Sequence, residues 1–249
     1  MKFGSNGQVK VSVVIPAFNE ERLIGETLRQ VRAAMAAFAA RGWATELIVC
    51  DNNSTDRTGE LARAAGAAVV FEPEIQIARA RNSGAAAATG DWLIFVDADS
   101  HPTAELFADV AAQIESDRCL AGGSTVRLDT HHRSARLAAK LWNWTSRATH
   151  WLAGSFIFCE ATAFRQVGGF SQELFAAEEI DLSRRLKKLA RTTGRKIVIL
   201  HRHPLLTSAR KIELYTPAEH FRFLAKTVLR GGKPLTNRDA CHTWYDGRR

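Results

Sequence analysis

Short apolar runs alternate with longer amphipathic stretches through the first hundred residues of the chain. The apolar runs predict strands, and the stretches with helical periodicity predict helices between them. The predicted strands cover residues 9–16, 46–50, 67–71 and 92–96, and the predicted helices cover 19–40, 56–65 and 77–89. Strands and helices that alternate at these spacings predict an α/β domain whose central sheet is mostly parallel and flanked by helices.

The second half of the chain has a less regular pattern, which predicts an appended subregion. Helices are expected at 102–116, 133–152, 178–190 and 217–229, and strands at 120–128, 154–159 and 196–200. The helix at 133–152 carries Trp142, Trp144 and Trp151. Three interpretations of that helix stay open: it packs into a core, it offers a stacking surface to a substrate, or it lies in a membrane interface.

Polar clusters follow three of the predicted strands, at 16–20, 51–56 and 97–99. In parallel sheets ligands bind beyond the carboxyl ends of the strands, so these clusters predict one shared site. Asp97 and Asp99 come directly after a buried strand, and strand alternation would point both to one side. Two such carboxylates are costly unless a cation meets them, and a hard divalent ion that also binds phosphate would serve. The alternative is that they only end the strand and cap the next helix.

The composition is that of an ordinary globular protein. With 249 residues, 46% of them hydrophobic and 24% charged, one domain is the default expectation. No apolar run approaches the ~20 residues that cross a bilayer, and residues 1–8 lack the apolar region of a signal peptide. The scattered cysteines at 50, 119, 159 and 241 indicate neither a disulfide framework nor a metal cluster, which favours the cytoplasm.

Positive charge is concentrated late in the chain. The net charge is +8, and basic residues gather at 184–188, 191–196, 201–211 and at the C-terminal end. Such an excess favours an anionic partner, namely a nucleotide, a nucleic acid or an acidic lipid surface. A run of charges can equally be the solvated face of a helix.

Several segments in order along the chain resemble the family 2 glycosyltransferases, which have the nucleotide-diphospho-sugar transferase (GT-A) fold. These segments are 13–21, 51–58, 80–91, 97–99, 168–170 and 178–182. The resemblance implies a single Rossmann-like GT-A domain over 1–249. Its nucleotide-sugar half would cover about 9–100 and its acceptor half about 101–230, followed by a basic tail at 231–249.

The resemblance also implies a donor site with a divalent metal, Mg²⁺ or Mn²⁺. Asp99 and Asp97 of the Asp-x-Asp motif would hold the metal, with His201 or His203 as a further ligand and His242 as another candidate. An asparagine stands at position 52 where the family commonly has aspartate, and its amide offers a base edge both a donor and an acceptor. The residues expected to bind the nucleotide sugar are Pro16, Ala17, Glu20, Asp51, Asn52, Arg81, Asp97 and Ala98.

In the same family a carboxylate in the 178–182 segment removes a proton from the acceptor hydroxyl. Glu179 is the expected base, with Asp181 as a second catalytic residue, and the transfer would invert the sugar by direct displacement. The residues expected to border the acceptor, whose identity stays open, are Gly154, Ser155, Gly169 and Glu178.

Two other functions are alternatives to this one. A nucleotidyltransferase would have a glycine-rich, basic loop after the first strand, whereas residues 17–21 are acidic and lack glycine. A basic module for nucleic acid or an anionic membrane would interleave cations and aromatic residues, as 142–147 does in part. No nucleic-acid partner is expected, and peripheral attachment to an anionic membrane stays open.

Overall fold

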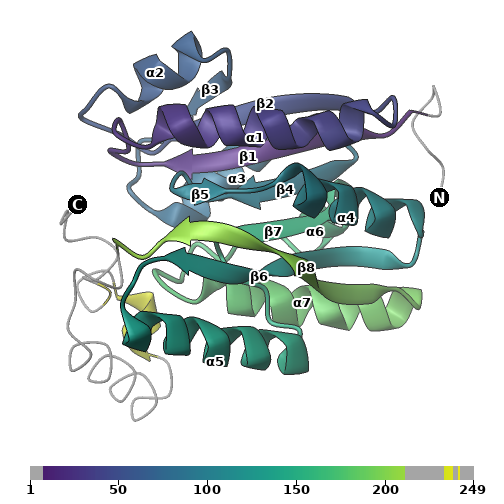
Figure 1. Ribbon diagram of the computed structural model, residues 1–249. Coiled ribbons are helices and arrows are strands. Elements are labelled where there is room, and N and C mark those ends of the chain that lie inside the picture. The colour runs from purple at the N-terminus through teal and green to yellow at the C-terminus, as the bar shows by residue number, and fades with distance from the viewer. Residues whose placement is uncertain (1–7, 211–232, 238–240, 242–249) are drawn as a thin grey trace.

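The computed structural model describes residues 8–210, 233–237 and 241. The elements alternate as predicted through β4 and become less regular afterwards (Figure 1). In chain order they are β1 (Lys10–Ala17), α1 (Ile24–Ala39), β2 (Ala44–Asp51), α2 (Thr58–Ala64), β3 (Ala68–Phe71), α3 (Ile77–Ala87), β4 (Trp92–Val96), β5 (Ser100–His101), α4 (Ala104–Glu115), β6 (Cys119–Asp129), α5 (Arg133–Thr149), β7 (Phe156–Glu160), α6 (Ala161–Gln166), α7 (Glu178–Thr193), β8 (Lys196–Ser208) and the 3₁₀ helix η1 (Lys233–Thr236).

The described strands form one mixed sheet in the order β3-β2-β1-β4-β7-β6-β8-β5. The first four are parallel neighbours, and Ala17 at the end of β1 lies beside Asp51 at the end of β2. β7 runs antiparallel to both β4 and β6, whereas β6 and β8 are parallel. The antiparallel direction of β7 places its start beside the end of β4, with Phe156 paired to Val96. This α/β fold is the one expected from the sequence.

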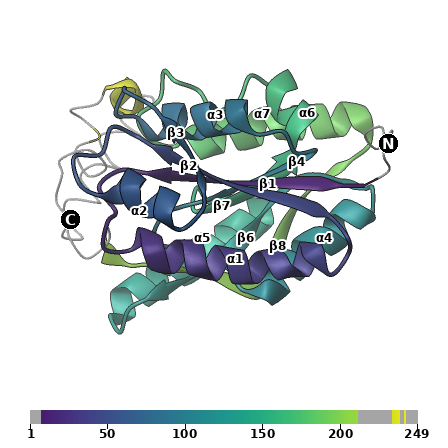
Figure 2. The ribbon, with the colours of Figure 1, turned by 90° about the horizontal axis from the view of Figure 1, so that it is seen from above.

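Two helical layers cover the two faces of the sheet (Figure 2). One hydrophobic core lies between the sheet and α1 and α4, and a second lies between the sheet and α3, α6 and α7. Helix α3 approaches β1 closely at Gly84, where an added Cβ would lie 2.5 Å from a methyl carbon of Val14. Glycine at this position therefore lets α3 carry Arg81 beneath the ends of the parallel strands.

Several predicted boundaries are wrong. Helix α1 begins at Ile24 and not at residue 19, because Asn19 has a left-handed backbone with φ of 51° and belongs to a loop. Strand β8 continues to Ser208, whereas the sequence predicted its end at residue 200. The strand accommodates residues 201–204 as a bulge, since β6 pairs Ser124 with Leu200 and then Val126 with Leu205. The predicted helix at 217–229 lies outside the described residues.

Helix α5 packs against β6 and buries little of its own surface. Asn143 fixes it by accepting a hydrogen bond from the Val126 N–H at 2.9 Å and donating one to the Val126 carbonyl at 2.8 Å. Only Ala135 and Ser146 of the helix are fully buried, and Trp144 is exposed, so the helix itself contributes little to the core. None of the helices in the described ranges is long and apolar enough to cross a membrane.

Candidate functional site

The loops that follow β1 and β2 are bonded to each other at the carboxyl edge of the sheet. The Asn19 side-chain oxygen accepts a hydrogen bond from the Thr55 N–H at 2.8 Å, and the Asn19 N–H donates to the Ser54 hydroxyl at 3.0 Å. The Asn52 N–H donates to the Ala17 carbonyl at 2.8 Å. The polar clusters after these two strands therefore form one surface, as the sequence predicted.

Pro16, Ala17 and Asp51 lie at this edge, at the ends of β1 and β2. Pro16 and Ala17 are buried within the sheet, so what they present at the edge is mainly backbone. One carboxylate oxygen of Asp51 accepts the Ser54 N–H at 3.0 Å, which fixes the turn that follows β2. Their positions fit the predicted nucleotide-binding role, which stays a prediction.

The structure gives Asn52 a different task from the one predicted. Its amide nitrogen donates to the carbonyls of Glu72 at 3.2 Å and Glu74 at 2.6 Å, and its amide oxygen accepts the Gln76 N–H at 2.9 Å. Both amide hydrogens are thus used inside the protein, and the side chain is buried. Asn52 ties β2 to the loop before α3 and has no donor left for a base.

Arg81 is the centre of a buried charge network that joins both halves of the sheet. Its guanidinium donates to Glu178 at 2.6 Å, to Asp97 at 3.0 Å and to the Gly154 carbonyl at 2.9 Å. The guanidinium also lies over the ring of Phe170, 5.1 Å from its centroid. Arg81 is only 1% exposed, so these contacts take the place of water.

Two predicted roles change as a result. Arg81 was expected to face a base or phosphate, but it is enclosed by protein groups, and one of its nitrogens, Nε, has no partner. Glu178 was expected to border the acceptor, but it is buried and paired with Arg81. Burial alone would lower the pKa of Arg81, and the carboxylates of Asp97 and Glu178 reverse this and raise it. Arg81 therefore remains charged and positions Asp97.

Glu179 projects from the first turn of α7 toward the same network. The residue before the helix, Ala177, holds a left-handed backbone with φ of 61°, which sets the direction in which the helix starts. Glu179 is half-buried, and a Cβ built on Gly154 would lie 3.7 Å from its carboxyl carbon. Burial, followed by the negative charge of Glu178, raises the pKa of Glu179 to about 8. A carboxyl with this pKa exchanges its proton near neutral pH.

Asp181, the second predicted catalytic residue, is committed elsewhere. Its carboxylate forms a 2.6 Å ion pair with Arg185 one turn later on the same helix. The pair is partly exposed and typical of i, i+4 positions on a helix surface. In this conformation Asp181 supports α7 and does not join the network around Arg81.

The predicted acceptor residues Gly154, Ser155 and Gly169 border the site through their backbones. The Ser155 carbonyl accepts the Asp97 N–H at 3.2 Å, next to the bond from Arg81 to Gly154. Gly169 has φ of 67°, and the turn that it forms is docked on α3 because Asn82 bonds both backbone groups of the next residue. The structure thus brings these segments to one place around Arg81 and Glu179.

Asp97 and Asp99 do not share one face as strand alternation predicted. β4 ends at Val96, and residues 97–99 form a turn in which alternation no longer applies. Asp97 turns to Arg81, whereas Asp99 lies 3.9 Å from the guanidinium of Arg210. Ala98 between them is buried, and its carbonyl accepts the hydroxyl of Thr27 at 2.7 Å.

Arg210 is a site residue that the sequence analysis missed. One of its nitrogens donates to both carboxylate oxygens of Glu20, each at 2.8 Å, and the same nitrogen approaches Asp99. The short pairing of Ser100 with Thr207 brings the end of β8 to this position. The sequence held only a weak signal, because Arg210 is one of several cations in the basic run at 201–211 and the predicted strand ended at residue 200.

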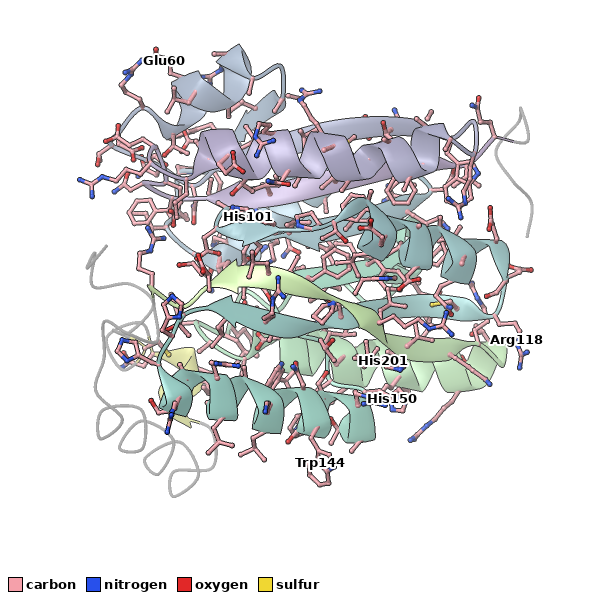
Figure 3. All side chains as sticks on the ribbon, in the orientation of Figure 1. Glu60, His101, Arg118, Trp144, His150 and His201 are labelled. Carbon is pink, nitrogen blue, oxygen red and sulfur yellow. The ribbon has the colours of Figure 1, made fainter. Side chains whose placement is uncertain are left out.

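The two candidate histidines lie away from Asp99. His203 is 3.0 Å from Asp109 of α4, and exposed His201 lies in the interior of β8, as Figure 3 shows. In the parts of the chain that the structure describes, no three His, Cys, Asp or Glu side chains form a group that could hold a metal ion. The reason is the extension of β8, which places both histidines within a strand and not at its carboxyl end. The further candidate His242 lies outside the described residues.

The family assignment follows from a comparison of the whole sequence. The model of the family described as glycosyl transferase family 2 matches residues 12–167, which is more than half of the chain. The chain belongs to glycosyl transferase family 2. The matched segment begins in β1 and includes Arg81 and the Asp-x-Asp turn, and α7 with Glu179 follows it.

Similar proteins agree with this family and with the fold. A glucosyl-3-phosphoglycerate synthase of Mycolicibacterium smegmatis is 39% identical over 97 residues, which cover 36% of this chain and 30% of that protein. A mannosyltransferase of Pyrobaculum calidifontis in complex with GDP-Man and Mn²⁺ has a TM-score of 0.66 at 18% identity, covering 95% of this chain and 70% of the other. For a glucosyl-3-phosphoglycerate synthase of Mycobacterium tuberculosis with Mn²⁺, UDP and glucosyl-3-phosphoglycerate, the TM-score is 0.60 at 20% identity, with 89% and 77% covered. These structures share the fold of this family 2 chain.

Proposed function

We propose that the chain transfers a sugar from a nucleotide diphosphate sugar to an acceptor hydroxyl. The observation that carries this proposal is that Asp97 and Glu179 both lie close to the buried guanidinium of Arg81, while Asp99 lies two residues after Asp97 beside Arg210. The diphosphate of the donor needs a cation to neutralise it, and carboxylates can hold a metal cation. The acceptor needs a base, and a carboxylate can also act as one. The two structural neighbours named above bind GDP-Man or UDP together with Mn²⁺, which supports the same class of donor.

The carboxylates fit a divalent metal of the Mg²⁺ or Mn²⁺ type. Asp99 and Glu20 already surround a positive charge, since Arg210 lies between them. Mg²⁺ usually binds one or two carboxylates and completes its shell with water and substrate phosphates, so a site without three protein ligands suits it. Asp99 would hold the ion, with Asp97 as a further ligand. A metal held there would neutralise the charge of the departing diphosphate.

Glu179 is proposed as the base of an inverting transfer. When the acceptor oxygen attacks the anomeric carbon, the bond to the diphosphate breaks and the acceptor loses its proton to the Glu179 carboxylate. The raised pKa of Glu179, about 8, makes its carboxylate a stronger base than an ordinary one. Arg81 bonds Asp97 and the carbonyl of Gly154, which lies beside this carboxylate, and so fixes the groups that surround the proposed base.

A thermal-shift panel tests the donor and metal roles together. UDP-, GDP-, ADP- and dTDP-sugars are each added with and without Mn²⁺ to the wild type and to Asp99→Asn. A donor at a hundred times its Kd adds about 2.7 kcal/mol to the free energy of unfolding, which raises the Tm of a chain of this size by about 5–10 °C. We expect one nucleotide to stabilise the wild type only with Mn²⁺ and to lose this effect in Asp99→Asn. No shift with any donor would contradict the proposal.

Product analysis separates this function from its rivals. A family 2 transfer releases a nucleoside diphosphate, whereas a nucleotidyltransferase releases pyrophosphate. The anomeric configuration of the product, read by NMR, tests inversion, and retention would remove Glu179 from its role as base. A cytoplasmic location stays a prediction; Cys50, Cys119 and Cys159 are buried thiols outside any disulfide, and this state fits a reducing compartment.

A further inference from the structure

One face of α5 presents large apolar side chains to solvent. Within the described ranges the exposed large apolar residues are Phe71, Leu137, Leu141 and Trp144, and the last three lie on this helix. Their spacing of four and then three residues places them in one stripe along the helix. Their exposed fractions are 68%, 64% and 70%, and Figure 3 shows Trp144 pointing away from the rest of the molecule. An apolar stripe left this open marks an interaction surface.

The same helix is strongly basic. Its sequence contains Arg133, Arg136, Lys140 and Arg147 and no acidic residue. These four side chains are exposed, and their spacing sets them in a second stripe beside the apolar one. A helix that combines an apolar stripe, a tryptophan and a cationic edge has the character of an interfacial helix that binds anionic lipid.

The body of the protein holds this surface in place. Asn143 binds both backbone groups of Val126 in β6, and Ser146 donates to the Trp151 carbonyl at 2.6 Å where the chain leaves the helix. Lys187 of α7 also donates to the Thr149 carbonyl at the end of α5. The side of the helix that carries Asn143 and Ser146 is thus occupied by the fold, while the apolar stripe faces outward. The surface needs no rearrangement to bind a partner.

We propose that α5 docks the protein on an anionic membrane surface, with Leu137, Leu141 and Trp144 entering the headgroup boundary. Charge complementarity selects this partner. A second copy of the same face would set four cations against four, which opposes self-association. A nucleic acid would neutralise the cations and leave the leucines in water. This inference is independent of the proposed sugar transfer, because membrane binding is measured without donor or acceptor.

Vesicle sedimentation of the 249-residue chain tests the proposal. Vesicles of phosphatidylcholine alone are compared with vesicles of equal parts phosphatidylcholine and phosphatidylglycerol, at low and high salt. We expect the protein to pellet with the anionic vesicles at low salt and to be released in part by high salt. Leu141→Gln with Trp144→Gln should weaken binding about 10-fold or more. Each cation near the surface strengthens binding about fivefold, so Lys140→Gln with Arg147→Gln should weaken it about 25-fold.

Matched control variants change the same residue types elsewhere. Phe71→Gln removes an exposed apolar side chain on β3, and Arg32→Gln with Arg63→Gln removes two exposed arginines from α1 and α2. These elements lie at the opposite side of the molecule from α5 (Figure 1). The controls should pellet like the wild type, and all variants should keep its Tm.

Three results would overturn the proposal. The first is equal binding to neutral and anionic vesicles, or binding that the α5 variants leave unchanged. The second is a dimer, seen by light scattering, that the α5 apolar variant abolishes. The third is binding to duplex DNA that depends on the α5 apolar side chains.

Discussion

The buried pair of Arg81 and Glu178 makes a sharp prediction about stability. The pair joins α3 to α7 across 97 residues of sequence, with both side chains almost completely buried and 2.6 Å apart. Arg81→Met removes the cation and leaves the Glu178 carboxylate without its partner, and Asp97 loses one as well. Arg81→Met with Glu178→Met removes both members of the pair and replaces them by apolar side chains of similar size.

The three variants are expected to lower the free energy of unfolding by different amounts. Removal of one partner of a buried pair costs 3–5 kcal/mol on average, because a charge is left in a low dielectric, so Arg81→Met should lower the free energy of unfolding by about 4 kcal/mol. Glu178→Met should cost about 1–3 kcal/mol, since Arg81 keeps Asp97 and the Gly154 carbonyl. The double variant should be more stable than Arg81→Met alone, because no buried carboxylate in α7 is then unpaired.

Urea denaturation followed by circular dichroism measures all three variants. Arg29→Met serves as the matched control, because Arg29 forms a 2.6 Å ion pair with Glu26 that is largely exposed. This control should leave the free energy of unfolding nearly unchanged, because solvent screens the exposed pair. The comparison isolates burial as the cause, since both substitutions break an arginine–glutamate pair of equal length.

Two outcomes would refute this reasoning. If Arg81→Met lowers the free energy of unfolding no more than Arg29→Met does, the network is not desolvated as the structure indicates. If the double variant loses the sum of the two single losses, then the pair does not act as a unit. In either case Arg81 would not be the residue that holds the two halves of the site together.

Three further predictions follow from the site. The pKa of Glu179 is about 8 in the folded chain and about 4.5 in an unfolded one, so the free energy of unfolding should fall as the pH rises between these values. Glu179→Gln should flatten this slope in urea titrations from about pH 4.5 to 8. Arg210→Gln removes the cation between Glu20 and Asp99, so the variant should bind Mn²⁺ alone about fivefold more tightly, or better, by calorimetry. Unchanged or weaker binding would show that the metal does not occupy the position of the Arg210 guanidinium. Ala177→Gly should add about 0.5–1 kcal/mol to the free energy of unfolding, because glycine relieves the left-handed backbone; a loss in urea would show that the alanine is not strained.

The parallel half of the fold could be predicted because its signals are local. Each strand from β1 to β4 is a short apolar run, three of the four runs are followed by a polar cluster, and such clusters necessarily gather at one edge of a parallel sheet. The family resemblance rested on the same clusters. It predicted Glu179 and the Asp-x-Asp turn as site residues, and the structure places Glu179 and Asp97 close to Arg81.

The remaining features depend on contacts between distant residues. Arg81 was expected to face a ligand because nothing local showed that Glu178, 97 residues later, would enclose it. The sequence predicted the end of β8 at residue 200 because three polar residues and a proline follow. In the structure β6 pairs with β8 on both sides of the bulge that these four residues form. Arg210 reaches Asp99 only through the pairing of β5 with β8. None of these pairings leaves a periodicity in the sequence.

The direction of β7 has a consequence for how this domain can be altered. Residues 121–123 of β6 pair with residues 157–159 of β7, so the segment that contains α5 connects two neighbouring strands. A loop closed at its base in this way costs only about 0.6 kcal/mol more for each doubling of its length. The segment between Asp129 and Gly154 can therefore be replaced by a segment from another protein. A chimera could exchange that segment for another of different length while the register of the sheet, and the carboxylates at its edge, stay in place.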